Sequence, residues 1–167
     1  MSNERGPCLL LISLGALTGA VLEAVARSDL FARIVVASRR PGPAQAKANA
    51  VRVGAGIEGR FPSVAVEAFD LGAPDAARRL AEIGRKHAPD MALAAPSRAA
   101  WWRVDKAAAS RGALAAVPFA GFLAAHLAPM QALRAAWAEA GMRCPWVGAS
   151  YPDVVNAILA RTGPAPL

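Results

Sequence analysis

Cysteine and histidine are scarce in this chain of 167 residues, which has two of each. Cys8 and Cys144 border two predicted strands with two others expected between them, and at ~4.8 Å per strand step this gap exceeds the reach of a disulfide. His87 and His126 are far in sequence from each other and from both cysteines, and His126 has the apolar neighbours of a core-edge residue. We therefore expect neither a disulfide nor a metal site.

Acidic residues are also few, so that the formal net charge is +7. The basic residues are scattered, and the adjacent pairs are Arg39-Arg40, Arg78-Arg79 and Arg85-Lys86. A nucleic-acid surface is expected to have clustered basic residues, whereas this sequence has no basic run with interleaved aromatic residues. We expect no nucleic-acid partner.

Charged residues are missing from 112 to 133, a length sufficient to cross a bilayer. Prolines, a histidine and a glutamine interrupt this segment, and interior strands of a parallel sheet are near-continuous apolar runs. A buried strand followed by a buried helix explains the segment better than a membrane span. Residues 8–22 share features with a secretory leader, but their removal would delete the first predicted strand. We expect a cytoplasmic protein without a membrane partner.

The N-terminal pattern is the most informative one. A strand-like run over 8–14 leads into Gly15-Ala16-Leu17-Thr18-Gly19, an Ala-rich helical pattern follows, and a second apolar run ends at Ala37. A strand, a small-residue turn, a helix and a second strand form the dinucleotide-binding βαβ unit, in which the turn lets a pyrophosphate approach the helix N-terminus. We predict that Gly15, Ala16, Leu17, Thr18 and Gly19 make this turn.

The glycine spacing departs from G-x-G-x-x-G. With Gly19 as the last glycine, Leu14 and Ala16 stand at the first two positions; with Gly15 as the first, Leu17 and Ala20 stand at the other two. Neither register fits, so an ordinary strand-turn-helix connection is the alternative interpretation.

The end of the second strand predicts the choice of cofactor. An acidic residue there accepts hydrogen bonds from a free ribose 2′-hydroxyl and repels a 2′-phosphate. This chain has Ser38, Arg39 and Arg40 instead. Guanidinium groups bind phosphate oxygens bidentately and stack on aromatic rings, so the pattern predicts NADP rather than NAD.

The remaining chain continues the alternation of strands and helices. The predicted strands are 8–14, 33–38, 63–69, 90–95, 113–118 and 145–149. The helical patterns are 18–28, 43–54, 74–87, 99–111, 120–140 and 153–162, with a kink or restart expected at Pro129. This pattern predicts one α/β domain over residues 1–167, a doubly wound parallel six-stranded sheet of the Rossmann type in the order 3-2-1-4-5-6. The ligand crevice is then expected at the C-terminal ends of the first and fourth strands.

Two further strand ends supply candidate binding residues. Asp70 and Leu71 follow the third strand, where the aspartate either accepts a hydrogen bond from an adenine amino group or initiates a turn. Ala95, Pro96 and Ser97 follow the fourth strand, where small residues let a nicotinamide ribose lie close. Beyond them, Trp101 and Trp102 either stack on a ligand or anchor the start of a helix.

The sequence indicates no catalytic residue. Tyr151 is the single tyrosine, and Val155 stands four positions on, which excludes the tyrosine–lysine proton transfer of short-chain dehydrogenases. Two isolated histidines do not provide a Ser-His-Asp or Cys-His set.

Five segments in order, G-A-L-T-G, A-S-R-R-P, V-A-V-E-A-F-D-L, P-D-M-A-L-A-A-P-S and A-S-Y-P-D-V-V-N-A-I-L-A-R-T-G, resemble the NADP-binding domain of saccharopine dehydrogenase-like oxidoreductases. The resemblance implies that residues 15–19 hold pyrophosphate, 38–40 the 2′-phosphate and 95–97 the nicotinamide side, with Tyr151–Asp153 and Asn156 lining the crevice. In that family a substrate and dimerisation domain follows, and we expect this chain to lack it and a second chain or subunit to supply it. The alternatives are a non-catalytic NADP-binding module and a Rossmann-shaped interaction protein.

Overall fold

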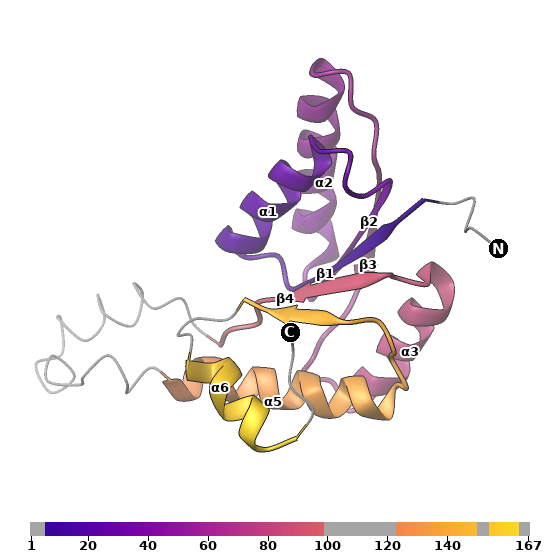
Figure 1. Cartoon of the computed structure of the whole chain (residues 1–167). Coiled ribbons are helices and arrows are strands. Elements are labelled where there is room, and N and C mark those ends of the chain that lie inside the picture. The colour runs from indigo at the N-terminus through magenta and orange to yellow at the C-terminus, as the bar shows by residue number, and fades with distance from the viewer. Residues whose placement is uncertain (1–5, 99–122, 150–153, 164–167) are drawn as a thin grey trace, which may run out of the picture.

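The computed structural model describes residues 6–98, 123–149 and 154–163 (Figure 1). Its strands are β1 (Cys8–Ile12), β2 (Arg33–Ser38), β3 (Ser63–Ala68), β4 (Met91–Ala94) and β5 (Trp146–Gly148). Its helices are α1 (Ala16–Ala26), α2 (Pro41–Ile57), α3 (Ala76–His87), α5 (Leu123–Glu139) and α6 (Val154–Arg161).

The strands form one parallel sheet in the order β3-β2-β1-β4-β5. Leu10, in the middle of β1, is in register with Val35 of β2 and with Ala92 of β4. From β1 the chain first adds β2 and β3 on one side and then returns to add β4 on the other side. This change of direction makes a topological switch point at the C-terminal end of β1. The predicted α/β class and doubly wound parallel sheet are confirmed.

Helices cover both faces of the sheet. Leu9 and Leu11 of β1 pack in a cluster that includes Leu22 of α1, whereas Leu10 and Ile12 pack on the opposite face in a cluster with residues of α3 and α5. All residues of β1 are buried, as is typical of an interior strand between two helical layers. Figure 1 shows α1 and α2 on one face and α3, α5 and α6 on the other.

Helix ends follow local chemistry. Helix α2 begins at a proline, which suits the first helical position because its missing N–H would have no partner there. Helix α3 carries Arg85, Lys86 and His87 in its last turn, where positive charge interacts favourably with the helix dipole, and it ends at Ala88 in the left-handed region (φ 43°).

The strand number and order differ from the prediction. The last strand, β5, pairs directly with β4, through Ala92 and Trp146 among others, so it occupies the place expected for the predicted strand 113–118. That segment and the predicted helix 99–111 lie outside the described residues. A continuous apolar tract indicates burial but does not determine which strand lies beside which, and this is why the order was wrong. Helix α5 runs unbroken through Pro129, so the expected restart of the helix does not occur.

Candidate functional site

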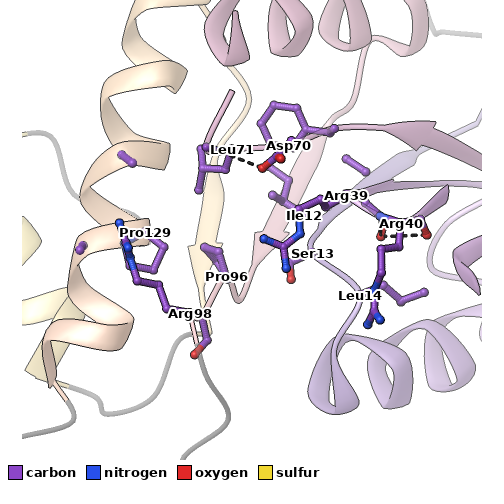
Figure 2. Close-up of a pocket in the computed structure, with 17 residues that line it drawn as sticks. Ile12, Ser13, Leu14, Arg39, Arg40, Asp70, Leu71, Pro96, Arg98 and Pro129 are labelled. Carbon is purple, nitrogen blue, oxygen red and sulfur yellow. Dashed lines mark hydrogen bonds between the residues drawn. The ribbon is translucent and has the colours of Figure 1, made fainter. Parts of the chain in front are cut away.

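A pocket of about 510 Å³ lies where the C-terminal ends of β1, β2, β3 and β4 meet α5 (Figure 2). This is the edge of the sheet at which doubly wound folds bind their ligands. Its lining consists of strand-end residues and one side of α5: Ile12, Ser13, Leu14, Ala37, Ser38, Arg39, Arg40, Phe69, Asp70, Leu71, Gly72, Pro96, Ser97, Arg98, Ala128, Pro129 and Ala132.

Predicted site residues from three different strand ends meet in this pocket. They are Ser38, Arg39, Arg40, Asp70, Leu71, Pro96 and Ser97. Residues 15–19 and Ala95 are not part of the lining, although Ser13 and Leu14 bring the start of the turn to it. The pocket also contains Arg98 and the α5 residues, which the sequence did not indicate as site residues.

The end of β2 presents two guanidinium groups. Arg39 and Arg40 are both exposed, and neither makes an ion pair with any residue of the described ranges. In Figure 2, Arg39 lies over the end of β1 and Arg40 lies beside Leu14. Ser38 differs from them: it is only 8% exposed, and its Oγ accepts a hydrogen bond from the backbone N–H of Arg40 at 3.3 Å. The hydroxyl therefore fixes the turn that carries the two arginines.

The turn after β1 has an unexpected register. Ser13 has a positive φ of 71°, the conformation that favours glycine, and its backbone N–H donates to the carbonyl of Ala37 at 2.9 Å. Gly15 caps α1, and Thr18, the third residue of this helix, is 1% exposed. Ser13, Gly15 and Thr18 have the spacing of the three glycines in G-x-G-x-x-G. This spacing differs from both registers considered from the sequence, because a serine occupies the position with positive φ.

The approach to α1 remains open despite these replacements. A Cβ built on Gly15 would meet no heavy atom of the described residues within 4 Å, so the space beside Gly15 at the helix N-terminus is open to them. The Gly15 N–H itself donates to Oγ1 of Thr18 at 2.8 Å. The first amides of α1 beyond it keep the exposed donor character of a helix N-terminus.

Asp70 has a structural role. Its Oδ1 accepts a hydrogen bond from the backbone N–H of Gly72 at 2.9 Å, which is the geometry of an aspartate that initiates a turn. The residue is exposed and lines the pocket. The turn interpretation is confirmed, and contact with an adenine stays a prediction.

The end of β4 is attached to α5 through a carbonyl that Pro129 leaves unbonded. Proline has no backbone N–H, so it cannot donate to the carbonyl of Ala125 four residues earlier. The backbone N–H of Arg98 donates to that carbonyl instead, at 3.0 Å. This hydrogen bond draws α5 into the pocket wall, a long-range relationship that no local pattern predicts.

Other candidate residues fall elsewhere. Trp101, Trp102 and residues 151–153 lie outside the described ranges. Asn156 donates from Nδ2 to the carbonyl of Gly148 at 2.7 Å and so holds α6 against the end of β5.

Burial shifts the pKa of three groups outside the pocket, which are His126, Cys8 and Cys144. His126 lies 6% exposed in α5, and burial lowers its pKa. Burial likewise raises the pKa of the Cys8 and Cys144 thiols, which are both free, and one strand rather than two lies between the strands that they border. Within the described ranges, no three His, Cys, Asp or Glu side chains group as a metal site would require. Nor does any described helix combine the length and apolarity needed to cross a membrane.

Comparison with known proteins reveals similarity at the level of the fold. No protein-family profile and no curated protein matches the sequence. The lactate dehydrogenase of Cryptosporidium parvum, solved with lactic acid and NAD, superposes with a TM-score of 0.67 at 15% identity over 98% of this chain and 43% of that one. The malate dehydrogenase of Salinibacter ruber gives 0.62 at 17% identity, over 95% and 42%. The lactate dehydrogenase of Eimeria maxima, solved with NADH and oxamate, gives 0.62 at 15% identity, over 99% and 42%.

These similarities establish the Rossmann-type α/β fold. The chain spans about two fifths of the length of these dehydrogenases.

Proposed function

We propose that the chain is the nucleotide-binding portion of an NADP-dependent oxidoreductase. The observation that carries this proposal is the pair Arg39 and Arg40, exposed and without ion-pair partners among the described residues, at the end of β2 in the switch-point pocket. No carboxylate follows β2 directly to receive a ribose 2′-hydroxyl. Two guanidinium groups favour a 2′-phosphate at this position.

The open space beside Gly15 supports the fit of a dinucleotide. No described heavy atom lies within 4 Å of the position that a Cβ on Gly15 would take, which leaves room for a pyrophosphate at the start of α1. In this proposal the turn over 15–19 receives the pyrophosphate, Arg39 and Arg40 bind the 2′-phosphate, and Asp70 and Leu71 border the adenine. Ala95 to Ser97 border the nicotinamide side. When bound, the nicotinamide supplies hydride transfer, and the residues of the chain orient it and exclude water.

The finer assignments rest on the sequence. Membership of the saccharopine dehydrogenase-like oxidoreductases, a second chain or subunit as partner and a cytoplasmic location remain predictions. The lactate dehydrogenases of Cryptosporidium parvum and Eimeria maxima were solved with NAD and NADH, so the preference for NADP is specific to this proposal.

Titration of the wild-type chain with NADPH and, separately, with NADH tests the proposal, with nicotinamide fluorescence as the signal. We expect saturable enhancement with NADPH and binding at least tenfold weaker with NADH, because a charge-assisted contact to phosphate is worth ~1.5–3 kcal/mol. Equal affinities would contradict NADP selectivity. Absence of binding by either nucleotide at millimolar concentration would favour the interaction-protein alternative.

A non-catalytic NADP-binding module is the second candidate. The pocket lining within the described ranges contains no His, Cys, Lys or Tyr, and its one carboxylate, Asp70, is engaged in a turn with the Gly72 N–H. Binding of NADPH without turnover of any carbonyl compound would favour this candidate over an oxidoreductase.

A further inference from the structure

Arg98 is a charged residue of the pocket that the proposed NADP site leaves without a function. It is exposed, lines the pocket and makes no ion pair with the described residues. Figure 2 shows its side chain on the α5 side of the pocket, near Pro129, whereas Arg39 and Arg40 lie on the opposite side. The pocket therefore has guanidinium groups on two separate walls.

The position of Arg98 is built into the fold. Its backbone N–H donates to the carbonyl of Ala125, which Pro129 cannot bond. This hydrogen bond attaches the segment after β4 to α5 at Arg98 itself. The hydrogen bond fixes the backbone of residue 98 beside α5, and the side chain that starts from this backbone lines the pocket.

The Arg98 side chain is directed toward α5, away from Arg39 and Arg40. In Figure 2 it lies beside Pro129, whereas Arg39 lies over the end of β1 and Arg40 lies beside Leu14. Adenine, ribose and the nicotinamide amide carry no negative charge, and the oxidised nicotinamide ring is positive. In this conformation a 2′-phosphate bound by Arg39 and Arg40 at the end of β2 consequently leaves the Arg98 guanidinium without an anionic partner.

We infer that Arg98 binds a second anionic group in the same pocket, a pair of phosphate or carboxylate oxygens distinct from the 2′-phosphate. This inference rests on the proposed function, since it assumes that the 2′-phosphate occupies Arg39 and Arg40. Two sources supply the same chemistry. One is the pyrophosphate of the dinucleotide, held from the α5 side because the Gly15 N–H is already bonded to Thr18; the other is the carboxylate of a second substrate beside the nicotinamide.

The test compares Arg98→Ala and Arg98→Lys with the wild type. Arg52→Ala is the matched control, because Arg52 is an exposed arginine outside this pocket and its loss changes the net charge equally. Circular dichroism and thermal melting first establish that each variant is folded. Four ligands are then titrated by calorimetry: NADPH, NADH and inorganic pyrophosphate on the free chain, and oxalate on the NADPH complex.

We expect Arg98→Ala to reduce the affinity for at least one of these ligands about ten- to a hundredfold. Arg98→Lys should reduce it less, because lysine keeps the positive charge but cannot form two parallel hydrogen bonds as a guanidinium does. Equal weakening of NADPH, NADH and pyrophosphate identifies the pyrophosphate as the anion. Unchanged nucleotide binding with loss of oxalate identifies a substrate carboxylate. If Arg98→Ala matches Arg52→Ala in every arm while the wild type binds NADPH, the inference is wrong and the proposed function stands.

The titrations can also support the anion site at Arg98 while contradicting the proposed NADP function. If the wild type binds neither nucleotide but binds pyrophosphate through Arg98, the anion site exists and the proposed NADP function is wrong. If it binds none of the ligands, both claims fail.

Discussion

Thr18 closes the N-terminus of α1 by accepting, at its Oγ1, a hydrogen bond from the backbone N–H of Gly15 at 2.8 Å. In a turn with glycine at the third motif position, that amide would have no side-chain partner and would face the ligand. The turn of this chain therefore has one free backbone donor fewer than such a turn. Three cationic side chains line the neighbouring pocket: Arg39, Arg40 and Arg98.

Gly15→Ala is expected to block nucleotide binding while leaving the fold intact. The backbone of Gly15 is extended (φ −97°, ψ −167°), a conformation that alanine adopts freely, and no heavy atom lies within 4 Å of the added Cβ. The methyl group then enters the space that a pyrophosphate needs. Fluorescence titration should reveal at least a tenfold loss for NADPH and NADH alike, with an unchanged melting temperature. Full retention of affinity would place the pyrophosphate elsewhere.

Ser13→Gly is expected to stabilise the protein. A non-glycine residue in the left-handed region costs ~1–2 kcal/mol, and the extra freedom of glycine in the unfolded chain offsets ~0.5–1 kcal/mol of the gain. Urea unfolding should therefore give a free energy of unfolding about 0.5–1 kcal/mol higher. Ser13→Ala keeps the strained backbone and serves as the control, with no gain in stability expected. A loss of stability in Ser13→Gly would mean that the serine hydroxyl outweighs the strain.

The first four strands were predictable from the sequence because each is a short apolar run bounded by glycine, proline or charged residues. Their order was predictable too, since parallel strands joined by helices obey a strong handedness rule. β5 is different. It has only three residues, and it pairs with β4, which lies far from it in the sequence. Local sequence patterns do not predict such a long-range pairing.

The candidate site was predictable at the strand ends but not across the pocket. Ser38 to Arg40 and Asp70 were identified because residues that directly follow parallel strands meet at one edge of the sheet. The function of Ser38 was not, because its hydroxyl turns back to the Arg40 backbone rather than toward the pocket. Arg98 could not be predicted as a site residue from the sequence. Its position depends on a hydrogen bond to the carbonyl of Ala125 in α5, which is distant in sequence and which Pro129 leaves free.

Glu67 is expected to make the stability of the protein sensitive to acid. This buried carboxylate of β3 accepts hydrogen bonds from Arg79, Lys86 and His87, each at 2.7 Å. Burial alone would raise the pKa of Glu67, but the hydrogen bonds and charges of His87 and Lys86 outweigh it and hold the pKa below its usual range. Because the folded pKa is lowered, the stabilisation is complete above the unfolded value of ~4.3 and is lost as the pH falls through the folded pKa.

Glu67→Gln removes the charge and keeps an acceptor, so it tests this relationship. We expect a loss of about 1.5–3 kcal/mol at pH 7 by urea unfolding, and a difference from the wild type that shrinks as the pH falls from the unfolded pKa of ~4.3 through the lowered folded pKa. Glu82→Gln is the matched control: Glu82 pairs with Arg78 and Arg79 at the surface, where such pairs contribute ~0–1 kcal/mol. A Glu67→Gln penalty that stays constant from pH 7 to pH 3 would contradict the ionic explanation.

Arg39→Ala is expected to weaken NADPH binding by roughly one to two decades and to leave NADH binding nearly unchanged. The guanidinium at the end of β2 meets a 2′-phosphate that only NADPH carries, and such charge-assisted hydrogen bonds are worth ~1.5–3 kcal/mol. Paired fluorescence titrations of the variant and the wild type measure this difference, and Arg52→Ala corrects for the loss of one positive charge. Since Arg98 lies on the other wall, its alanine variant should not reproduce this split between the two nucleotides. Equal losses of affinity for NADPH and NADH in Arg39→Ala would mean that the arginine supports the structure of the pocket and does not bind the 2′-phosphate.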